Sequence, residues 1–462
     1  MSAGMLDQVL DYLKADQPAA RDRLVEFLTI PSVSTDPAYT QQVHQAAQWV
    51  VQRLGECGLL TQVIATAGHP VVIGRSLPDM APPNAPTVLY YGHYDVQPPD
   101  PLEEWATAPF QPTVRDGAIY ARGACDDKGQ VSCFLEALRA WSQTTGTLPC
   151  HVIVMIEGEE ECGSANLPAM LEARKQELAA DIVVISDTTM WDRQTVAITY
   201  GLRGLLYYDV QLHHANRDLH SGMYGGVLAN PATMLTRVLG RLFDDDHRVT
   251  IPHFYDDVLP LSPQEKRQWA DLCFDEMHQC LAPVGVGTAF GEAGFTTLER
   301  LWSRPACDIN GLYGGYGGAG AKTVIPSFAG AKISFRLAPD QDPAKIGQAF
   351  EHWLTSYDVR GCQWQLQQLG SAHPVVVPSN SPYIAAAQKA VECTSGRPAV
   401  LVREGATLPV VADFKRILAI DSLLLGFGLK DDCIHAPNEK FNLSCFELGC
   451  RTHAVLLAEL SM

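Results

Sequence analysis

Residues 87–95 read TVLYYGHYD, an apolar run that stops at a histidine followed two residues later by an aspartate. The run is rich in β-branched and aromatic side chains and shows no polar alternation, which is typical of a strand buried on both faces. Such strands occur in sheets that helices cover on both sides. The segment therefore predicts an α/β fold, with His93 and Asp95 just after a buried strand.

Three further runs of strand character lead to side chains that can bind a metal ion. They lie at residues 152–156, 182–186 and 418–425, and lead to the acidic run 157–161, to Asp187 and to His435. In open α/β sheets the loops at the carboxyl ends of the strands diverge and leave a crevice in which ligands collect. We therefore expect these strand ends to converge on one site.

A fifth candidate lies in GACDDKG, residues 123–129, before a helix expected over residues 130–141. The residues alone do not choose between Asp126 and Asp127, nor among the acids of the run 157–161. Two histidines and three carboxylates form a nitrogen and oxygen set that suits Zn²⁺, with Mn²⁺ or Co²⁺ as substitutes. If one carboxylate bridges two ions, three ligand charges and a hydroxide balance two divalent cations.

The chain outside these motifs divides into two kinds of sequence. Apolar residues recur at helical spacing over residues 6–28, with a break at Pro18, and over residues 41–54. Short apolar runs separated by helices follow, which predicts a sheet rich in parallel pairs. After Gly201 the pattern loosens, and residues 332–337 predict an edge or half-buried strand.

The α/β pattern resumes at about residue 381. A chain of 462 residues exceeds the size at which one hydrophobic core keeps growing. We therefore expect a catalytic, metal-binding domain formed by residues 1–201 and 378–462. Residues 202–377 are expected to form a smaller inserted α+β domain.

The composition excludes several kinds of partner. The formal charge of -18 creates a field that repels phosphate backbones and anionic lipids, so we expect neither nucleic acid nor a membrane as a partner. The N-terminus lacks the basic flank and apolar core of a signal peptide, and no apolar run is long enough to cross a bilayer. The 13 cysteines include no CxxC pair, which favours reduced thiols and a cytoplasmic enzyme.

Five segments, in the family's order, resemble the metal-site motifs of the M20 metallopeptidase family, in its cytosolic nonspecific dipeptidase and carnosinase branch. They are HYDVQ at 93–97, GACDDKG at 123–129, EEECGS at 159–164, SD at 186–187 and HAPNEK at 435–440. The resemblance covers nearly the whole chain. It implies a two-domain α/β protein of the phosphorylase/hydrolase-like, zinc exopeptidase fold. The mixed, mostly parallel sheet would be flanked by helices, and the inserted domain would be a ferredoxin-like lid and dimerisation domain.

The resemblance also implies roles for the metal-site residues. The implied ligands are His93 and Asp187 on one ion, Glu161 and His435 on the other, and Asp126 as the bridge between them. Asp95 would orient His93, as metal-bound imidazoles usually require. Glu160 falls at the position of the general acid/base. A cis peptide bond between Asp126 and Asp127 is also implied.

Further matches lie in the inserted domain and in the loop after residue 402. His220, in DLHSG, resembles the histidine that in dimeric members reaches the partner's active site and steadies the oxyanion. Thr323 and Arg336 match positions that hold the substrate's carboxylate, the latter through a guanidinium fork. The segment REGAT resembles a substrate loop that usually reads EGGS, which implies substrate contacts from Glu404 and Thr407.

Together these residues predict a homodimeric two-metal exopeptidase that cleaves dipeptides or short peptides. A water between the ions would attack the carbonyl, and Glu160 would carry the proton. The alternative is a hydrolase of N-acyl or N-carbamoyl amino acids on the same site, but Asp187 stands where related deacylases and carboxypeptidases more often have Glu. A remote alternative is a catalytically inactive peptide-binding protein, which the presence of all five ligands and of Glu160 argues against.

Overall fold

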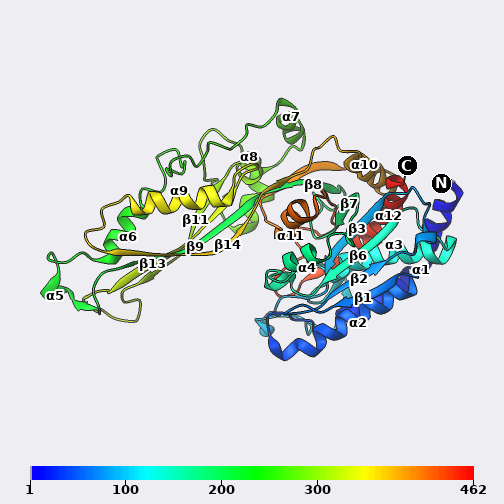
Figure 1. The fold of residues 1–462 in the computed structure, drawn as a ribbon, viewed down its shortest axis with the longest axis horizontal. Coiled ribbons are helices and arrows are strands. Elements are labelled where there is room, and N and C mark those ends of the chain that lie inside the picture. Colours follow the sequence, from blue (N-terminus) through cyan, green and yellow to red (C-terminus); the bar gives the residue numbers. More distant parts are fainter. Residues whose placement is uncertain (1–2, 462) are drawn as a thin grey trace. The chain divides into compact units, whose positions relative to one another are not determined.

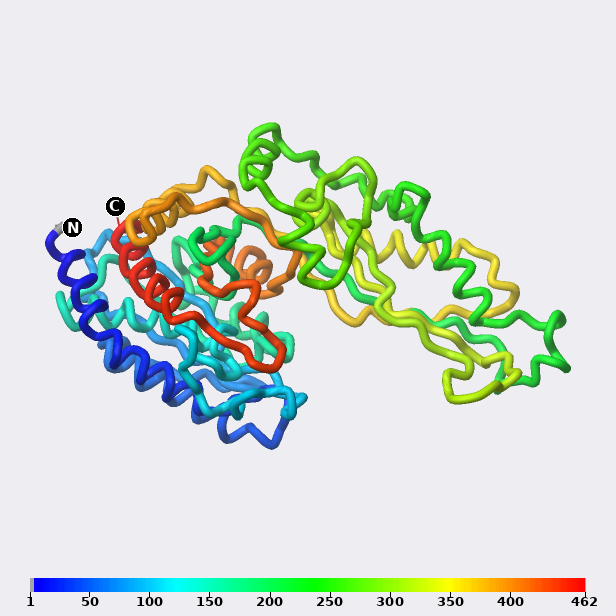
Figure 2. The backbone as a smooth tube through the Cα atoms, turned by 180° about the vertical axis from the view of Figure 1, so that it is seen from behind, coloured from blue at the N-terminus to red at the C-terminus, as the bar shows by residue number. Residues whose placement is uncertain are grey.

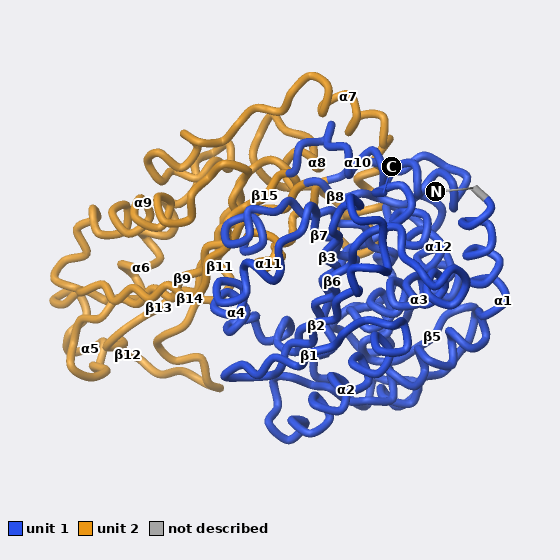
Figure 3. Tube along the Cα trace, turned by 45° about the vertical axis from the view of Figure 1, so that its right-hand side comes forward, with its two compact units in different colours: residues 1–200, 377–402, 413–462 blue, residues 201–376, 403–412 orange. Residues whose placement is uncertain are grey.

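The computed structural model describes residues 3–461. The chain forms two compact units (Figure 3). The first unit contains residues 1–200, 377–402 and 413–462, and the second contains residues 201–376 and 403–412. The loop at residues 403–412, which was expected in the catalytic domain, therefore belongs to the second unit.

A mixed sheet forms the centre of the first unit (Figure 1). In spatial order its strands are β1 (Leu60–Ile64), β2 (Val71–Arg75), β6 (His151–Glu157), β3 (Thr87–His93), β7 (Ile182–Ile185), β17 (Ser422–Leu424) and β8 (Ala197–Leu202). The four strands β6, β3, β7 and β17 pair in parallel. Their carboxyl ends therefore lie at the same edge of the sheet.

Antiparallel pairs flank these four strands. Strand β1 pairs with β2, β2 pairs with β6, and β17 pairs with β8, all antiparallel. The expectation of a mostly parallel sheet is therefore wrong outside the four central strands. Parallel neighbours need a long crossover, whereas the short connection between β1 and β2 can join only antiparallel strands.

Helices cover the sheet and bury its apolar side chains. They are α1 (Ala3–Leu28), α2 (Thr40–Glu56), α3 (Lys128–Thr145), α4 (Leu167–Ala173), α10 (Pro382–Ser395) and α12 (Leu443–Leu460). Helices α1, α3 and α12 pack against one another, and Figure 2 shows the first and last helices of the chain side by side. Tyr90 of β3 stacks on Phe134 of α3 with ring centroids 3.9 Å apart. Burying side chains of this size stabilises the fold by about 1.5–3 kcal/mol each.

Helix α1 runs without interruption through Pro18, so the expected break there is wrong. Proline cannot donate a hydrogen bond to the carbonyl of residue 14. Lys14 and Pro18 both lie on the exposed face, where water can reach that oxygen. The opposite face is held by buried residues such as Leu24 and Phe27.

The second unit contains a four-stranded antiparallel sheet. Its spatial order is β11 (Ala306–Gly314), β13 (Phe328–Leu337), β9 (Gly204–His213) and β14 (Gln363–Ala372). Helices α6 (Pro231–Leu239) and α9 (Pro343–Thr355) pack against it, and with them the chain order is β-α-β-β-α-β, the ferredoxin-like arrangement. Residues 332–337 lie in β13, which is a half-buried interior strand and not an edge.

Shorter elements complete the second unit. They are β10 (Leu219–His220), α5 (Ser221–Tyr224), α7 (Pro263–Asp271), α8 (Thr297–Trp302), β12 (Val324–Ile325), β15 (Val375–Val376), the end of β16 (Val400–Glu404) and most of α11 (Pro409–Asp413). Helices α7 and α8 each begin with a capping box, in which Ser262 and Thr296 bond the main chain three residues on. These caps satisfy main-chain N–H groups that short helices leave unpaired.

Two features bear on expectations from composition. Within residues 3–461, no helix is both long enough and apolar enough to cross a bilayer. The 13 cysteines are free thiols. Burial raises the pKa of Cys57 to about 12, so this thiol stays protonated and acts as a small apolar side chain.

Candidate metal centre

His93 is the last residue of β3 and lies beside Glu157, the last residue of β6. The imidazole is fully buried at the carboxyl edge of the parallel strands. The residue before it must be glycine, because a Cβ at Gly92 would lie 2.5 Å from Val131 Cγ2 and 2.7 Å from Asp127 Oδ2. Tight packing behind the strand end therefore fixes the position of the ring.

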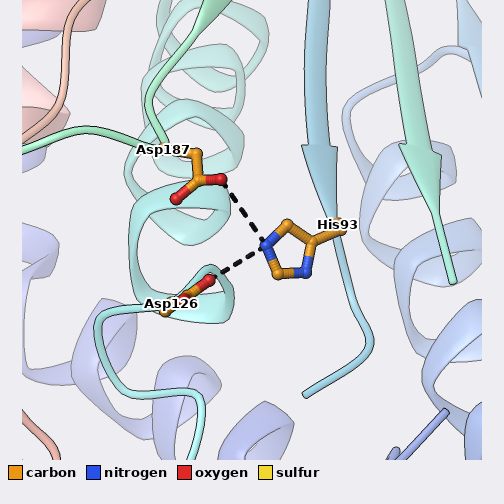
Figure 4. Close-up of side chains that lie close together, drawn as sticks. All are labelled: His93, Asp126 and Asp187. Carbon is orange, nitrogen blue, oxygen red and sulfur yellow. Dashed lines mark ion pairs between the residues drawn. The ribbon is translucent and has the colours of Figure 1, made fainter. Parts of the chain in front are cut away.

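Asp126 and Asp187 meet His93 at this edge (Figure 4). His93 Nε2 lies 3.0 Å from Asp126 Oδ1 and 3.8 Å from Asp187 Oδ2. Asp126 comes from the loop before α3, and Asp187 from the loop after β7. The peptide bond between Asp126 and Asp127 is cis, as expected. These three side chains form one group whose ligand atoms are close enough to hold a single ion.

A second group shares Asp126 with the first. His435 Nε2 lies 2.9 Å from Asp126 Oδ2 and 3.2 Å from Glu161 Oε2. Asp126, Glu161 and His435 therefore form a second set of three possible ligands. The two oxygens of Asp126 face different histidines, which is the arrangement required of a bridging carboxylate. The structure thus brings the five expected ligands together in the two expected sets.

The two halves of the site differ in exposure. The side chain of His93 is 0% exposed, whereas that of His435 is 52% exposed. His435 has a backbone φ of 61°, in the left-handed region that non-glycine residues seldom adopt. Asn438 holds this loop, because its Oδ1 accepts from Ala106 N and its Nδ2 donates to Glu104 O, both at 2.8 Å.

The imidazoles and carboxylates shift one another's pKa values. Burial lowers the pKa of His93, but the nearby carboxylates of Asp126 and Asp95 outweigh it and raise the pKa well above 6.5. Hydrogen bonds to Asp126 and Glu161 raise the pKa of His435 to about 10. Burial raises the pKa of Asp126, but the two imidazoles hold it well below its usual range. The cluster therefore favours positive charge at its centre, which divalent cations can supply.

Asp95 supports both halves of the site. His93 Nδ1 lies 3.1 Å from the main-chain oxygen of Asp95 and 3.4 Å from its carboxylate, which leaves Nε2 facing the acids. The Asp95 carboxylate also accepts hydrogen bonds from the N–H groups of Glu160 (3.3 Å) and Glu161 (3.0 Å). Gln97 Nε2 donates to Glu161 Oε2 at 2.8 Å, and this contact was not anticipated.

Glu160 begins a short 3₁₀ turn and is half-buried. Burial raises the pKa of its carboxyl to about 9, with further contributions from Asp187 and Glu161 and an opposing one from His93. The main chain of this turn is tied to Asp95, so the Glu160 carboxyl is carried by the same segment as the ligand Glu161.

Two buried residues without a predicted role, Arg122 and Glu439, hold the Asp126 loop. Glu439 Oε2 accepts from Arg122 Nη1 and from Gly123 N, both at 2.8 Å. Glu439 Oε1 accepts from Cys125 N at 2.9 Å and Asp126 N at 3.1 Å. Glu439 lies in the HAPNEK motif at residues 435–440, which marks it as a residue near the site. The neighbouring sequence does not show that its partner is the loop of Asp126.

His220 and Thr323 are brought close to each other in the second unit. Strands β10 and β12 pair so that His220 lies opposite Val324, and Ser221 N donates to Thr323 O at 3.1 Å. His220 Nδ1 accepts from Gly222 N at 2.9 Å. In the neutral ring the proton therefore lies on Nε2. Both side chains are exposed.

Arg336 and Thr407 also meet in the second unit. Arg336 Nη1 donates to Thr407 Oγ1 at 2.8 Å, and Thr407 Oγ1 donates to Arg203 O at 2.7 Å. Glu404 ends β16, and its main-chain oxygen accepts from Arg203 N at 3.3 Å. The loop after residue 402 is therefore tied to the start of β9 through Arg203.

The five-residue set fits two divalent cations. His93 Nε2 is a buried ring nitrogen that lacks a well-aligned hydrogen bond, although two carboxylates lie within 3.8 Å. A buried polar atom of this kind needs a partner, and a metal ion at the centre of the acids would be one. Neutral imidazole with carboxylates is a donor set typical of Zn²⁺ and also compatible with Mn²⁺.

Two overlapping His–carboxylate groups at the carboxyl edge of parallel strands define the class of a metal-dependent hydrolase. Comparison with known proteins identifies the family. The profile of peptidase family M20/M25/M40 matches residues 89–459, and the chain belongs to this family. It is a metallopeptidase-type enzyme that hydrolyses peptide bonds, and its relatives lie in the dipeptidase branch.

The chain is similar to named dipeptidases over almost its full length. It is 32% identical to the Cys-Gly metallodipeptidase DUG1 of Candida albicans, over 97% of this chain and 96% of that protein. It is 30% identical to the Beta-Ala-His dipeptidase of Mus musculus, over 99% of this chain and 96% of that protein. The crystal structure of human carnosine dipeptidase 1 matches with a TM-score of 0.82 and 29% identity, over 99% of each chain.

Proposed function

We propose that this chain is a two-metal exopeptidase that hydrolyses dipeptides or short peptides. The observation that carries the proposal is that the two oxygens of Asp126 face His93 and His435, each beside a second carboxylate. We expect Zn²⁺ in both positions, with Mn²⁺ or Co²⁺ as substitutes. The similarity to a Cys-Gly dipeptidase and a Beta-Ala-His dipeptidase supports dipeptides as substrates.

Divalent ions bound there would supply Lewis-acid activation of a water and of the peptide carbonyl. Glu160 takes one proton from the attacking water as its oxygen bonds to the carbonyl carbon. Glu160 then delivers that proton to the nitrogen of the leaving amine as the C–N bond breaks. Asp95 keeps Glu160 and Glu161 in place through their main-chain N–H groups and orients the ring of His93.

Residues of the second unit bind the substrate in this proposal. Arg336 and Thr407 hold its terminal carboxylate, since a guanidinium and a hydroxyl offer charge-assisted and neutral hydrogen bonds to the same group. Thr323 and Glu404 contribute further contacts. His220 presents Nε2–H as a donor to the oxyanion, because its Nδ1 is already occupied by Gly222 N.

The proposal includes the assembly and the compartment of the enzyme. The second unit acts as a lid and dimerisation domain, and His220 serves the active site of the partner in a homodimer. The enzyme is cytoplasmic, in keeping with its 13 free cysteines. Neither a nucleic acid nor a membrane is a partner.

The decisive experiment is a substrate panel with defined metals. Metal-stripped protein is reloaded with Zn²⁺, Mn²⁺ or Co²⁺ and given dipeptides, tripeptides and N-acetyl or N-carbamoyl amino acids. We expect release of free amino acids from dipeptides in at least one metal form. Hydrolysis of the acylated substrates alone would overturn the exopeptidase proposal, and peptide binding without any hydrolysis would show an inactive relative.

A further inference from the structure

Arg203 lies between β8 and β9 and is 8% exposed. Three of its hydrogen bonds reach the loop at residues 403–407. Its main-chain N–H donates to Glu404 O at 3.3 Å, its Nε donates to Gly405 O at 3.2 Å, and its carbonyl oxygen accepts from Thr407 Oγ1 at 2.7 Å. One residue therefore holds this loop at three points.

The far side of the same guanidinium is bound to helix α8 and the turn after it. Arg203 Nη1 donates to Arg300 O at 3.3 Å and to Arg304 O at 3.4 Å. Within the described chain, the side-chain hydrogen bonds of Arg203 all go to main-chain oxygens. The guanidinium thus works as a rigid connector between α8 and the loop, not as one half of an ion pair.

Gly405 shows how closely the loop packs on this connector. A Cβ at position 405 would lie 2.8 Å from Arg203 Nη2 and 3.0 Å from Leu301 O. The second of these atoms belongs to the backbone and cannot rotate away. Glycine is therefore the residue that lets the loop lie directly against the guanidinium.

The contact between Arg203 and Thr407 also orients Arg336. Because the Thr407 hydroxyl gives its proton to Arg203 O, its lone pairs are left to accept from Arg336 Nη1. Among the described residues, this is the hydrogen bond that the Arg336 side chain makes, so its other N–H groups remain available. Burial and the neighbouring Arg336 lower the pKa of Arg203 to about 10, which reflects two guanidinium groups close together.

We propose that Arg203 is a positioning residue for carboxylate recognition. It fixes Thr407 through its carbonyl oxygen and fixes the loop through its guanidinium, so that Arg336 is held with its free N–H groups directed at the substrate's terminal carboxylate. This inference rests on the proposed function, in which Arg336 and Thr407 bind that carboxylate.

Two substitutions of Arg203 distinguish a positioning role from an effect of its positive charge. Lysine would keep the positive charge but has a single nitrogen that cannot reach carbonyl oxygens on both sides at once. Methionine would remove the charge and the donors while filling most of the space. If Arg203 acts by positioning, Arg203→Lys and Arg203→Met should behave alike. If its charge alone mattered, Arg203→Lys would behave as wild type.

The kinetic test compares one dipeptide with its C-terminal amide, which lacks the carboxylate. We expect both Arg203 variants to raise KM for the free dipeptide about tenfold, with a smaller change in kcat and little change in KM for the amide. Arg237→Met removes an exposed arginine from α6 of the same unit and is the matched control. An equal loss on the two substrates, or no loss on either, would overturn the inference.

A second measurement does not depend on turnover. Hydrogen–deuterium exchange of the peptide covering residues 403–412 reports how firmly the loop is held. We expect faster exchange in Arg203→Met than in wild type and Arg237→Met. Unchanged exchange in a folded Arg203→Met variant would refute the positioning role, whereas a wild-type enzyme that cleaves no dipeptide would refute the proposed function instead.

Discussion

Glu439 accepts a hydrogen bond from the main-chain N–H of Asp126 at 3.1 Å, although the two residues are 313 positions apart in the chain. The same carboxylate pairs with Arg122, and both partners are almost completely buried. The last motif of the sequence therefore holds the loop that carries the bridging carboxylate. Removing this contact should affect stability and metal binding together.

Glu439→Gln should lower the free energy of unfolding by about 3 kcal/mol or more, because it leaves Arg122 buried without its counter-charge. Urea unfolding measures this change. Glu177→Gln removes an exposed ion pair with Arg174 and should cost less than about 1 kcal/mol. Equal effects of the two substitutions would contradict the anchoring role of Glu439.

Asp126→Ala should abolish binding of both ions, because each histidine faces one of its oxygens. Asp187→Ala removes a carboxylate that belongs to the His93 group alone. The other group, which contains Glu161 and His435, should still hold an ion. Titration calorimetry and elemental analysis of the purified variants measure the stoichiometry. Retention of a full metal complement by Asp126→Ala would show that this residue is not the bridge.

Glu160→Ala should leave the metal content near that of wild type and lower kcat by about 10²–10⁴-fold, the range expected for loss of a general acid/base. Steady-state kinetics and metal analysis on the same sample test both halves of this prediction. Glu172→Ala, an exposed residue of α4, is the control and should turn over normally. Normal kcat in Glu160→Ala would remove Glu160 from its proposed role.

His220→Ala should lower activity without unfolding the chain, because the side chain is exposed. Mixing it with Glu160→Ala should restore about a quarter of wild-type activity, since half of the dimers are mixed and each mixed dimer has one complete site. The mixture is assayed after reversible dissociation. If it stays inactive although mixed dimers form, the site is not shared across subunits.

His453 makes stability depend on pH. Its ring is fully buried against Tyr90, Phe134 and Phe427, and Ser186 Oγ lies 2.9 Å from Nε2. Burial lowers the pKa of His453 from 6.5 to about 3, so the unfolded chain binds a proton between these values and the folded chain does not. The stability that the buried neutral ring gives the folded state is therefore complete above pH 6.5. It is lost as the pH falls below 6.5, by about 1.4 kcal/mol per pH unit.

The measurement is urea unfolding of wild type and His453→Gln between pH 4 and pH 7. Glutamine can still bond Ser186 but does not titrate, so the difference between the two proteins should shrink as the pH falls. His44→Gln changes an exposed histidine of α2 and should follow wild type at every pH. A constant difference between wild type and His453→Gln would show that His453 does not titrate in this way.

Several parts of the fold could be predicted from sequence because their signals are local. The apolar run at residues 87–91 and the helix at residues 130–141 lie in β3 and α3, and each is decided by side chains that are neighbours in the chain. The antiparallel flanks of the sheet could not be read in this way. Pairing direction depends on connections and neighbouring strands, and a short apolar run does not encode it.

The metal-capable side chains at the strand ends and the family of the chain could be recognised without coordinates, because they depend on the order and type of the motif residues. Three relationships became visible in the folded chain: Asp126 faces two histidines, Glu439 anchors the loop of Asp126, and Arg203 binds the loop at residues 403–407. The physical reason is that these contacts join residues far apart in the chain. Their partners are selected by packing and by the need to satisfy buried polar groups, which acts only in the folded protein.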